Sequence, residues 1–458
     1  MTTNRYYPGL LLFLIFCFSG CGGSGQNIVT SNSGQSSQTV PVNLAILPQD
    51  ALSAPGGDRN FRVLATFDDG TVREVADEVQ FSSDNDLVTL DEADPGRVRI
   101  SDNLSGGETA RITATFRGLT ATATLTLAHH AYVANSGDLS VTVADIGEDG
   151  ALTFRTAAAP TGPPNPVGLG MSADGRYLYA VSDTVDAVRT FRIEDNGTLT
   201  GTGTGNQTDI ATGRGPRAVA VDPLGRFVYV VNQNDNDISL YTVSESGTLQ
   251  AGLPDVSVPA SPLDATIDPS GSYLYVTSFE TDQVNSFAIG EDGGLTLVGS
   301  PVLATDGQGN GGGAGSIEVD PSGQYVYVTN SRRSQVFNFL IQPDGSLTEN
   351  GPPAPAAQGT FGLAVDPLGR FAYTGEGGLD LISSFAINAT GALESLSLFN
   401  LAGGEPSALA IDASGSYLYV VNTAVNNVDF FTIGSNGALT PIGDAFSGSR
   451  PTDIVLTP

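Results

Sequence analysis

Three reactive side chains are absent or scarce in this 458-residue chain: lysine does not occur, cysteine occurs twice and histidine twice. Without lysine, chemistry that runs through a lysine Schiff base is excluded. Both cysteines, Cys17 and Cys21, lie close to the N-terminus. Everything after residue 21 therefore has no disulfide, no thiol nucleophile and no cysteine-ligated metal.

Positive charge is also scarce. The 19 basic residues are all arginines, and they stand against 49 acidic residues, which gives a net charge of −30. Nucleic-acid affinity rests on neutralising phosphates, so this balance argues against a nucleic-acid partner. It also argues against docking onto an anionic lipid surface through protein charge. Solubility in a salty exterior is the simplest reading of the charge.

The N-terminus carries one positive charge, Arg5, followed by an apolar run from Leu10 to Phe18. That run is too short to span a membrane and is typical of a signal peptide. It ends in Phe18-Ser-Gly-Cys21, which resembles a bacterial lipoprotein signal over residues 1–21 with lipidation at Cys21; ordinary cleavage is the alternative. Residues 22–42 are predicted to form a flexible tether. We therefore expect a bacterial envelope protein held by its lipid anchor at the outer membrane or cell surface.

One phrase, an aromatic strand and a closing Gly-x-Leu-Thr or near copy, returns seven times after residue 128, and an aspartate-containing turn precedes the strand in six of the copies. The second aromatic residue of the copies marks a period of 46 to 52 residues: Tyr132, Tyr179, Tyr229, Tyr275, Tyr327, Tyr373 and Tyr419. A fixed period of this length with strand-type residues inside it is typical of repeat architectures. Each repeat holds four short alternating runs, which is the content of one propeller blade.

The two ends of the repeat region predict how the ring closes. No apolar first strand precedes Tyr132, whereas an extra copy of that strand, Arg450–Leu456, follows the seventh repeat. We expect this C-terminal segment to complete the first blade, because sharing it removes an open sheet edge. The predicted fold is all-β, with a seven-bladed β-propeller over residues 129–458.

A separate unit is predicted for residues 43–128. Phe61–Thr71 and Ala110–Gly118 alternate as strands bounded by turns. The Phe-x-Asp-Gly-Thr and Ile-Thr-Ala phrases resemble the bacterial Ig-like group 2 domain, which implies a small antiparallel β-sandwich. Its expected role is spacing or adhesion, and an inert spacer is the simpler alternative.

The repeats themselves, with Tyr-Val-x-Asn (the YVTN pattern) and Gly-x-Leu-Thr, resemble the seven-bladed lactonase family, which includes propeller-type 6-phosphogluconolactonases. The resemblance implies hydrolysis of a cyclic carboxylic ester. Family enzymes carry Gly-Pro-Arg-His and Val-Asn-Glu around one mouth of the central channel. The matching phrases here are Gly215–Ala218 and Val231–Gln233. Arg217 matches, but Ala218 and Gln233 replace a histidine and a glutamate, so enzymatic activity is an open question and the catalytic residues are unknown.

By propeller topology, the loop entering each inner strand and the loop leaving the second strand share one face. Candidate ligand-binding residues on that face are Arg217, Arg332, Arg333, Arg450, Gln233, Glu280 and Glu376. Arginines there can hold a carboxylate or phosphate by paired hydrogen bonds; the alternative is that several form surface ion pairs. His129 and His130 stand at the expected domain junction and are interpreted as solvated linker. No metal site and no cofactor is predicted.

Two functions remain open. In the first, the propeller binds an anionic sugar lactone, either without reaction or with hydrolysis in the manner of a 6-phosphogluconolactonase. In the second, it is a non-enzymatic envelope scaffold or adhesion protein whose propeller face binds a protein or a glycan. The fold alone does not choose between them.

Overall fold

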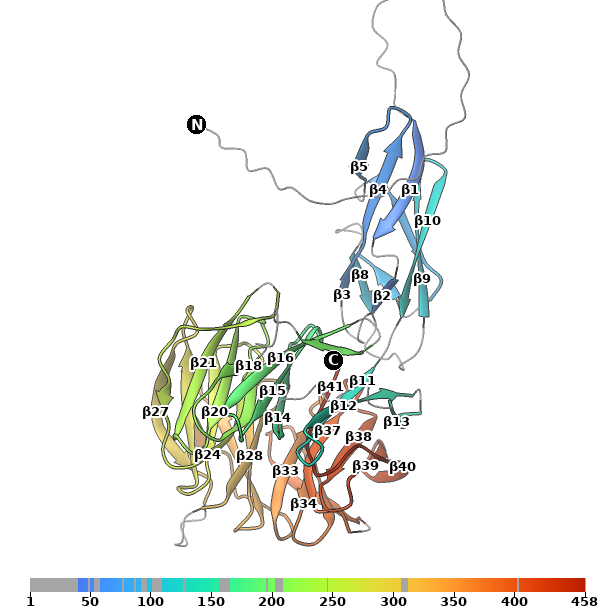
Figure 1. Ribbon diagram of the computed structural model, residues 1–458. Coiled ribbons are helices and arrows are strands. Elements are labelled where there is room, and N and C mark those ends of the chain that lie inside the picture. The colour runs from blue at the N-terminus through green and yellow to red at the C-terminus, as the bar shows by residue number, and fades with distance from the viewer. Residues whose placement is uncertain are drawn as a thin grey trace, which may run out of the picture. The chain divides into compact units, whose positions relative to one another are not determined.

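The computed structural model describes residues 40–457, apart from 48–49, 53–57, 76–77, 86–87, 92–96, 101–108, 127–128, 148, 156–164, 195–196, 202–208, 245, 306–311 and 402. The predicted signal peptide with Cys21 and nearly all of the predicted tether lie outside this range. Within it the regular elements are strands, and no α-helix is described (Figure 1). None of the described residues forms a helix long and apolar enough to cross a membrane.

Seven four-stranded antiparallel sheets make up the propeller, and in each the strands follow one another from the central channel outward. The innermost strands are β41 (Pro451–Leu456), β14 (Pro166–Met171), β19 (Pro216–Val221), β24 (Pro262–Ile267), β28 (Ala314–Val319), β33 (Thr360–Val365) and β37 (Pro406–Ile411). Neighbours in this order are in contact all the way round, and β37 contacts β41, so the ring is closed.

The second strands carry the repeated aromatic phrase. In the same order they are β11 (His130–Asn135), β15 (Tyr177–Ser182), β20 (Phe227–Asn232), β25 (Tyr273–Ser278), β29 (Tyr325–Asn330), β34 (Phe371–Glu376) and β38 (Tyr417–Asn422). These strands are the most deeply buried of each blade, because they lie between the first and third strands and between neighbouring blades.

The outer half of each blade is formed by two further strands. The third strands are β12 (Ser140–Ile146), β16 (Ala187–Ile193), β21 (Asp237–Val243), β26 (Gln283–Ile289), β30 (Gln335–Ile341), β35 (Leu381–Ile387) and β39 (Asn427–Ile433). The fourth are β13 (Leu152–Phe154), β17 (Leu199–Gly201), β22 (Leu249–Ala251), β27 (Leu295–Leu303), β31 (Leu347–Glu349), β36 (Leu393–Asn400) and β40 (Leu439–Phe446). Three blades add a short strand against the third: β18 (Asp209–Ala211), β23 (Val256–Ser257) and β32 (Ala354–Pro355).

The C-terminal strand completes the first blade, as the sequence predicts. β41 pairs antiparallel with β11, with Tyr132 opposite Val455, and Figure 1 shows the two side by side near the C-terminus. A second link closes the ring at the same place, because the Tyr419 hydroxyl of the last blade donates to the carbonyl of Gly150 in the first, at 3.0 Å.

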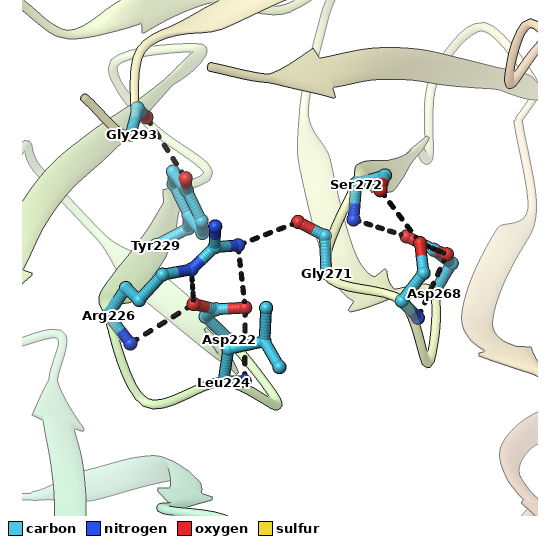
Figure 2. Close-up of polar contacts among 9 residues, drawn as sticks. Asp222, Leu224, Arg226, Tyr229, Asp268, Gly271, Ser272 and Gly293 are labelled. Atoms are coloured by element: carbon cyan, nitrogen blue, oxygen red, sulfur yellow. Dashed lines mark hydrogen bonds and ion pairs between the residues drawn. The ribbon is translucent and has the colours of Figure 1, made fainter. Parts of the chain in front are cut away.

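That tyrosine contact is one of a repeated set. All seven repeat tyrosines are fully buried, and six donate their hydroxyl to a turn-glycine carbonyl in the next blade. One example, Tyr229 to Gly293 at 2.9 Å, is drawn in Figure 2. Since a buried hydroxyl needs a partner, the repeat places one polar link within each of these apolar interfaces. Tyr275 is the exception, because its hydroxyl has no partner among the described residues.

The turn between first and second strands forms a further link between blades. The buried Asp222 carboxylate accepts from the Arg226 backbone N–H at 3.0 Å and from its Nε at 2.6 Å. The same guanidinium donates to the carbonyl of Gly271 in the next blade at 2.9 Å (Figure 2). Gly225 takes a φ of 71° in this turn, a conformation in which a Cβ is strained. Asp366 and Arg370 repeat the arrangement with Gly415.

The described residues between 40 and 126 form three small sheets of their own: β1-β4-β5, β2-β10-β9-β6 and β3-β8-β7. The strands are β1 (Pro41–Leu47), β2 (Asp50–Leu52), β3 (Asp58–Asn60), β4 (Arg62–Phe67), β5 (Val72–Glu74), β6 (Gln80–Ser83), β7 (Val88–Leu90), β8 (Arg97–Ile100), β9 (Thr109–Phe116) and β10 (Leu119–Thr126). They share one apolar core that includes Phe61, Phe67 and Ile112. One pairing, β2 with β10, is parallel, so these sheets are not purely antiparallel as the sequence suggested. The reason is that β2 follows β1 in sequence but belongs to a different sheet. The Ig-like assignment stays a prediction.

Candidate functional site

A cavity of about 420 Å³ occupies the centre of the propeller and is lined by residues from all seven inner strands. Inner strands are hydrogen-bonded on one side only, so their other edge presents backbone groups to this channel. Half of the lining residues are aliphatic, among them Leu169, Ile317 and Leu363, but most of the surface that faces the cavity is polar. Four of the lining side chains are charged or titratable: Arg217, Asp264, Glu318 and Asp453.

Arg217 lies at the start of β19, and its neighbour Ala218 also lines the channel. The Arg217 Nε donates to Gln233 Oε1 at 2.9 Å, and Gln233 Nε2 donates to Ser261 Oγ at 3.0 Å. The two positions that the sequence selected by family resemblance are therefore in direct contact. Asp183 Oδ2 lies 3.4 Å from an Nη atom of Arg217, and the described residues show no hydrogen bond donated by either Nη. One edge of the guanidinium is thus held by Gln233, and the other forms an ion pair with Asp183 that a ligand anion would displace.

The three channel carboxyls make the same kind of contact: each accepts a hydrogen bond from a backbone N–H on the inner strand of the next blade. Asp264 accepts from Ile317 at 3.0 Å, Glu318 from Val365 at 2.8 Å, and Asp453 from Leu169 at 2.7 Å. These bonds satisfy N–H groups on the otherwise unpaired channel edge of the inner strands. They bridge successive blades where no strand pairing does.

The same carboxyls titrate abnormally. Each lies deep within the ring, although it is half-buried because the channel reaches it. Burial raises the pKa of Asp264 to about 6 and that of Asp453 to about 7. For Glu318, burial and then the nearby Asp264 raise the pKa to about 8. At neutral pH the channel therefore holds protonated and ionised carboxyls together, which is a condition for acid–base chemistry.

Sequence reasoning missed these three carboxyls. Each stands alone inside a short apolar strand, and that is the signal that was available: an acidic residue within a run predicted to be buried. Their grouping depends on the ring, which brings together strands that are dozens of residues apart in sequence.

The other candidate arginines are not among the residues that line the cavity. Arg332 lies over the ring of Phe279, with its guanidinium carbon 5.5 Å from the ring centroid. Arg333 donates to Thr305 Oγ1 at 3.4 Å, and the backbone N–H of Arg450 donates to Asn426 at 2.7 Å. Glu280 is exposed in the turn after β25. Of the candidates, only Arg217 is placed on the wall of this cavity.

The interpretation of Glu376 as a loop residue is wrong. It is the last residue of β34 and is fully buried, where the YVTN pattern has its asparagine. Thr374 donates to its carboxylate at 2.7 Å and Ser383 at 2.9 Å, and Thr360 donates to it as well. Burial raises the pKa of this group above its ordinary value. Because three hydroxyls surround it inside the blade, Glu376 is a structural residue here.

The interpretation of the histidine pair as solvated linker is also wrong, because both side chains are buried. His130 begins β11, and its Nδ1 lies 3.0 Å from Asp145 Oδ1. Burial and the neighbouring Arg155 lower the pKa of His130 to about 4, so the ring is neutral near pH 7. The first blade needs these residues to complete its second strand. No group of three or more metal-ligating side chains is found among the described residues.

Comparison with known proteins agrees with this geometry. The family model described as "Lactonase, 7-bladed beta-propeller" matches residues 126–263 and 264–456. No curated protein is significantly similar in sequence.

Among solved structures, the chain resembles three bacterial proteins, each with a TM-score of 0.62 over 72% of this chain. A putative 6-phosphogluconolactonase from Bacteroides fragilis is 20% identical, with 98% of that protein covered. One from Bacteroides uniformis is 21% identical, with 99% covered. A periplasmic gluconolactonase from Pseudomonas aeruginosa is 18% identical, with 99% covered. At these identities the likeness shows the fold.

Proposed function

Because this chain belongs to the seven-bladed β-propeller lactonase family, we propose that it binds a sugar lactone bearing an anionic group in the central channel and hydrolyses it. The observation that carries the proposal is Arg217, which lines the channel with Nε held by Gln233 and no hydrogen bond from its Nη atoms among the described residues. A guanidinium fixed in this way has lost its freedom before the ligand arrives, so less entropy is lost on binding.

The anion contacts Arg217 and the lactone ring lies against the channel wall. Asp183 forms an ion pair with the guanidinium at 3.4 Å, and a phosphate or carboxylate ligand takes over that place with shorter, paired bonds. The ring hydroxyls donate to channel carboxylates, because a few polar groups placed in the wall fix the orientation of a small ligand. The Pseudomonas relative is a gluconolactonase and the Bacteroides relatives are putative 6-phosphogluconolactonases, and the substrates that these names give are sugar lactones.

Calorimetry with glucose 6-phosphate and glucose tests the binding step, because these rings resemble the lactone but cannot be hydrolysed. We expect the phosphate to bind at least about tenfold more tightly, the worth of one charge-assisted hydrogen bond of about 1.5–3 kcal/mol. Arg217→Ala should abolish the difference.

Arg214→Ala is the matched control. This arginine stands in the loop just before β19, pairs with Asp235 at 2.6 Å and does not line the channel, so its removal should leave the difference intact. Equal affinity of the wild-type protein for the two sugars would reject the anion site.

The second candidate is a non-enzymatic scaffold that binds a protein or glycan of the envelope. Ala218 and Gln233 favour it, because neither can act as the acid or base that a family histidine and glutamate supply. Binding of sugars without any hydrolysis of their lactones would support this candidate over the first.

We further propose that the protein is exported and anchored by lipid on Cys21. The support is the apolar run and the Phe18-Ser-Gly-Cys21 phrase in the sequence. Cys21→Ser should release the protein from membranes or leave an uncleaved precursor, while Cys17→Ser, four residues earlier, should change neither. Normal membrane retention of Cys21→Ser would reject the anchor.

A further inference from the structure

Ala218 stands on β19 where family enzymes have a histidine, but the next blade carries a titratable residue, Asp264, at the equivalent position. Pro216 and Pro262 occupy equivalent first positions in β19 and β24, so Asp264 holds in β24 the position that Ala218 holds in β19. Both residues line the same cavity, as does Glu318 from the next strand, β28. Arg217, Asp264 and Glu318 thus come from three successive blades and face one space.

The two carboxyls have different surroundings. Asp264 accepts from the backbone N–H groups of Ala265 at 2.8 Å and Ile317 at 3.0 Å, and donors of this kind favour its ionised form. Glu318 accepts a single backbone bond, from Val365 to Oε2 at 2.8 Å. No hydrogen bond to its Oε1 is found among the described residues. Burial leaves Asp264 with a pKa of about 6 and Glu318 with a pKa of about 8, so at pH 7 one is ionised and the other protonated.

We propose that Asp264 is the general base and Glu318 the general acid of lactone opening in the central channel, an assignment that rests on the proposed hydrolysis. Asp264 takes a proton from a channel water as the water oxygen bonds to the lactone carbonyl carbon. The bond from that carbon to the ring oxygen then breaks, and Glu318 gives its proton to the departing oxygen.

The balance of this step is one water consumed and one hydroxy acid formed. Asp264 ends protonated and Glu318 ionised, and a proton passes from the first to the second through channel water to restore the starting state. The new carboxylic acid loses its proton to solvent. No metal, cofactor or oxidant takes part.

Two other charged groups face the pair. Arg217, on β19, offsets the charge of an ionised Asp264, and Asp453, on β41, opposes it. The channel-lining residues of β14, β33 and β37 bring no titratable side chain. The protonation order of the pair follows from burial, from the hydrogen bonds that Asp264 accepts and from the effect of Asp264 on the pKa of Glu318.

The test is the pH profile of kcat/KM for 6-phosphogluconolactone, followed by proton uptake of a pH indicator with the uncatalysed rate subtracted. The full chain should give a bell-shaped profile with limbs near pH 6 and pH 8. Asp264→Asn should lower kcat about 10²- to 10⁴-fold and remove the acidic limb. Glu318→Gln should lower kcat and remove the alkaline limb.

Glu376→Gln is the control, a buried carboxyl with a raised pKa that lies outside the channel, and its profile should match the wild type. A far-ultraviolet circular dichroism spectrum that matches the wild type shows that the two channel variants fold. Hydrolysis by Asp264→Asn or Glu318→Gln with an unchanged rate or profile overturns the assignment and leaves the proposed function standing. Sugar binding without hydrolysis in the wild type defeats the hydrolytic part of the proposed function and the assignment with it, and loss of the Arg217-dependent binding defeats the anion site.

Discussion

Replacing Glu318 with glutamine should change the stability of the propeller in a strongly pH-dependent way. The folded protein holds this carboxyl with a pKa of about 8, whereas the ordinary value is 4.5. Between these two values the unfolded chain has lost its proton and the folded chain has kept it. Wild-type stability therefore falls as pH rises through this window, and it is flat above it because both states are then ionised.

The size of the effect follows from the pKa difference. A difference of this extent corresponds to at most about 5 kcal/mol, and water in the channel reduces it, so we expect about 2–5 kcal/mol at pH 9. Glutamine keeps the acceptor for the Val365 N–H, made at 2.8 Å in the wild type, and carries no charge at any pH. Glu318→Gln should therefore equal the wild type near pH 4.5 and exceed its stability at pH 9.

Urea denaturation at half-unit steps from pH 4.5 to pH 9, followed by circular dichroism, measures the difference directly. The other carboxyls with raised pKa values, Asp264 and Asp453, contribute equally to both proteins to a first approximation and cancel in the comparison. A difference between the two proteins that stays constant across the whole range would refute the reasoning, because it would mean that the Glu318 carboxyl titrates normally in the folded state.

Three further predictions concern the ring. Tyr419→Phe removes the hydrogen bond to Gly150 that helps to close the ring and should lower the free energy of unfolding by about 1 kcal/mol in chemical denaturation. Tyr275→Phe should not change it, because the Tyr275 hydroxyl has no partner among the described residues. Equal losses of stability would contradict the role given to the hydroxyl hydrogen bond. Truncation after Ser449 removes β41 and should yield insoluble protein or a large drop in Tm, since it leaves β11 with an open edge; a soluble, monomeric truncation of unchanged Tm would exclude β41 from the ring. Asp222→Asn breaks the ion pair between the buried Asp222 carboxylate and Arg226 and should lower the free energy of unfolding by about 2 kcal/mol. The control is Glu74→Gln, an exposed position where little change is expected. Equal stability changes in these two variants would show that the Asp222–Arg226 pair contributes nothing.

The fold could be predicted from the sequence because each blade repeats the same local sequence pattern. Tyr229 and its six counterparts mark the buried second strand, and Gly225 marks the turn that needs a positive φ. The extra strand-like segment before the C-terminus predicted closure of the ring. The first repeat lacks its inner strand and the last repeat is followed by a surplus one, so the C-terminal strand can complete the first blade. The signals within each blade lie within about ten residues of one another, where sequence patterns are informative.

The site was only partly readable. Arg217 and Gln233 were selected through family resemblance, and the structure shows them in contact. Asp264 and Glu318 were missed because their meaning comes from contacts with the next blade, and no pattern in their own strands records those contacts. Glu376 was misplaced for the opposite reason. Its local phrase looks like the start of a loop, but it substitutes for the buried asparagine that ends the second strand in four of the other six repeats.

Hydrolysis of 6-phosphogluconolactone by the purified full chain tests the central claim most directly. The assay compares the wild type with Arg217→Ala and the phosphorylated lactone with glucono-lactone, each corrected for spontaneous opening. The account predicts catalysed opening that is faster for the phosphorylated lactone, weaker at high salt and lost in Arg217→Ala, because a single arginine holds the anion at the channel. A wild-type rate no greater than that of buffer for both lactones would contradict it.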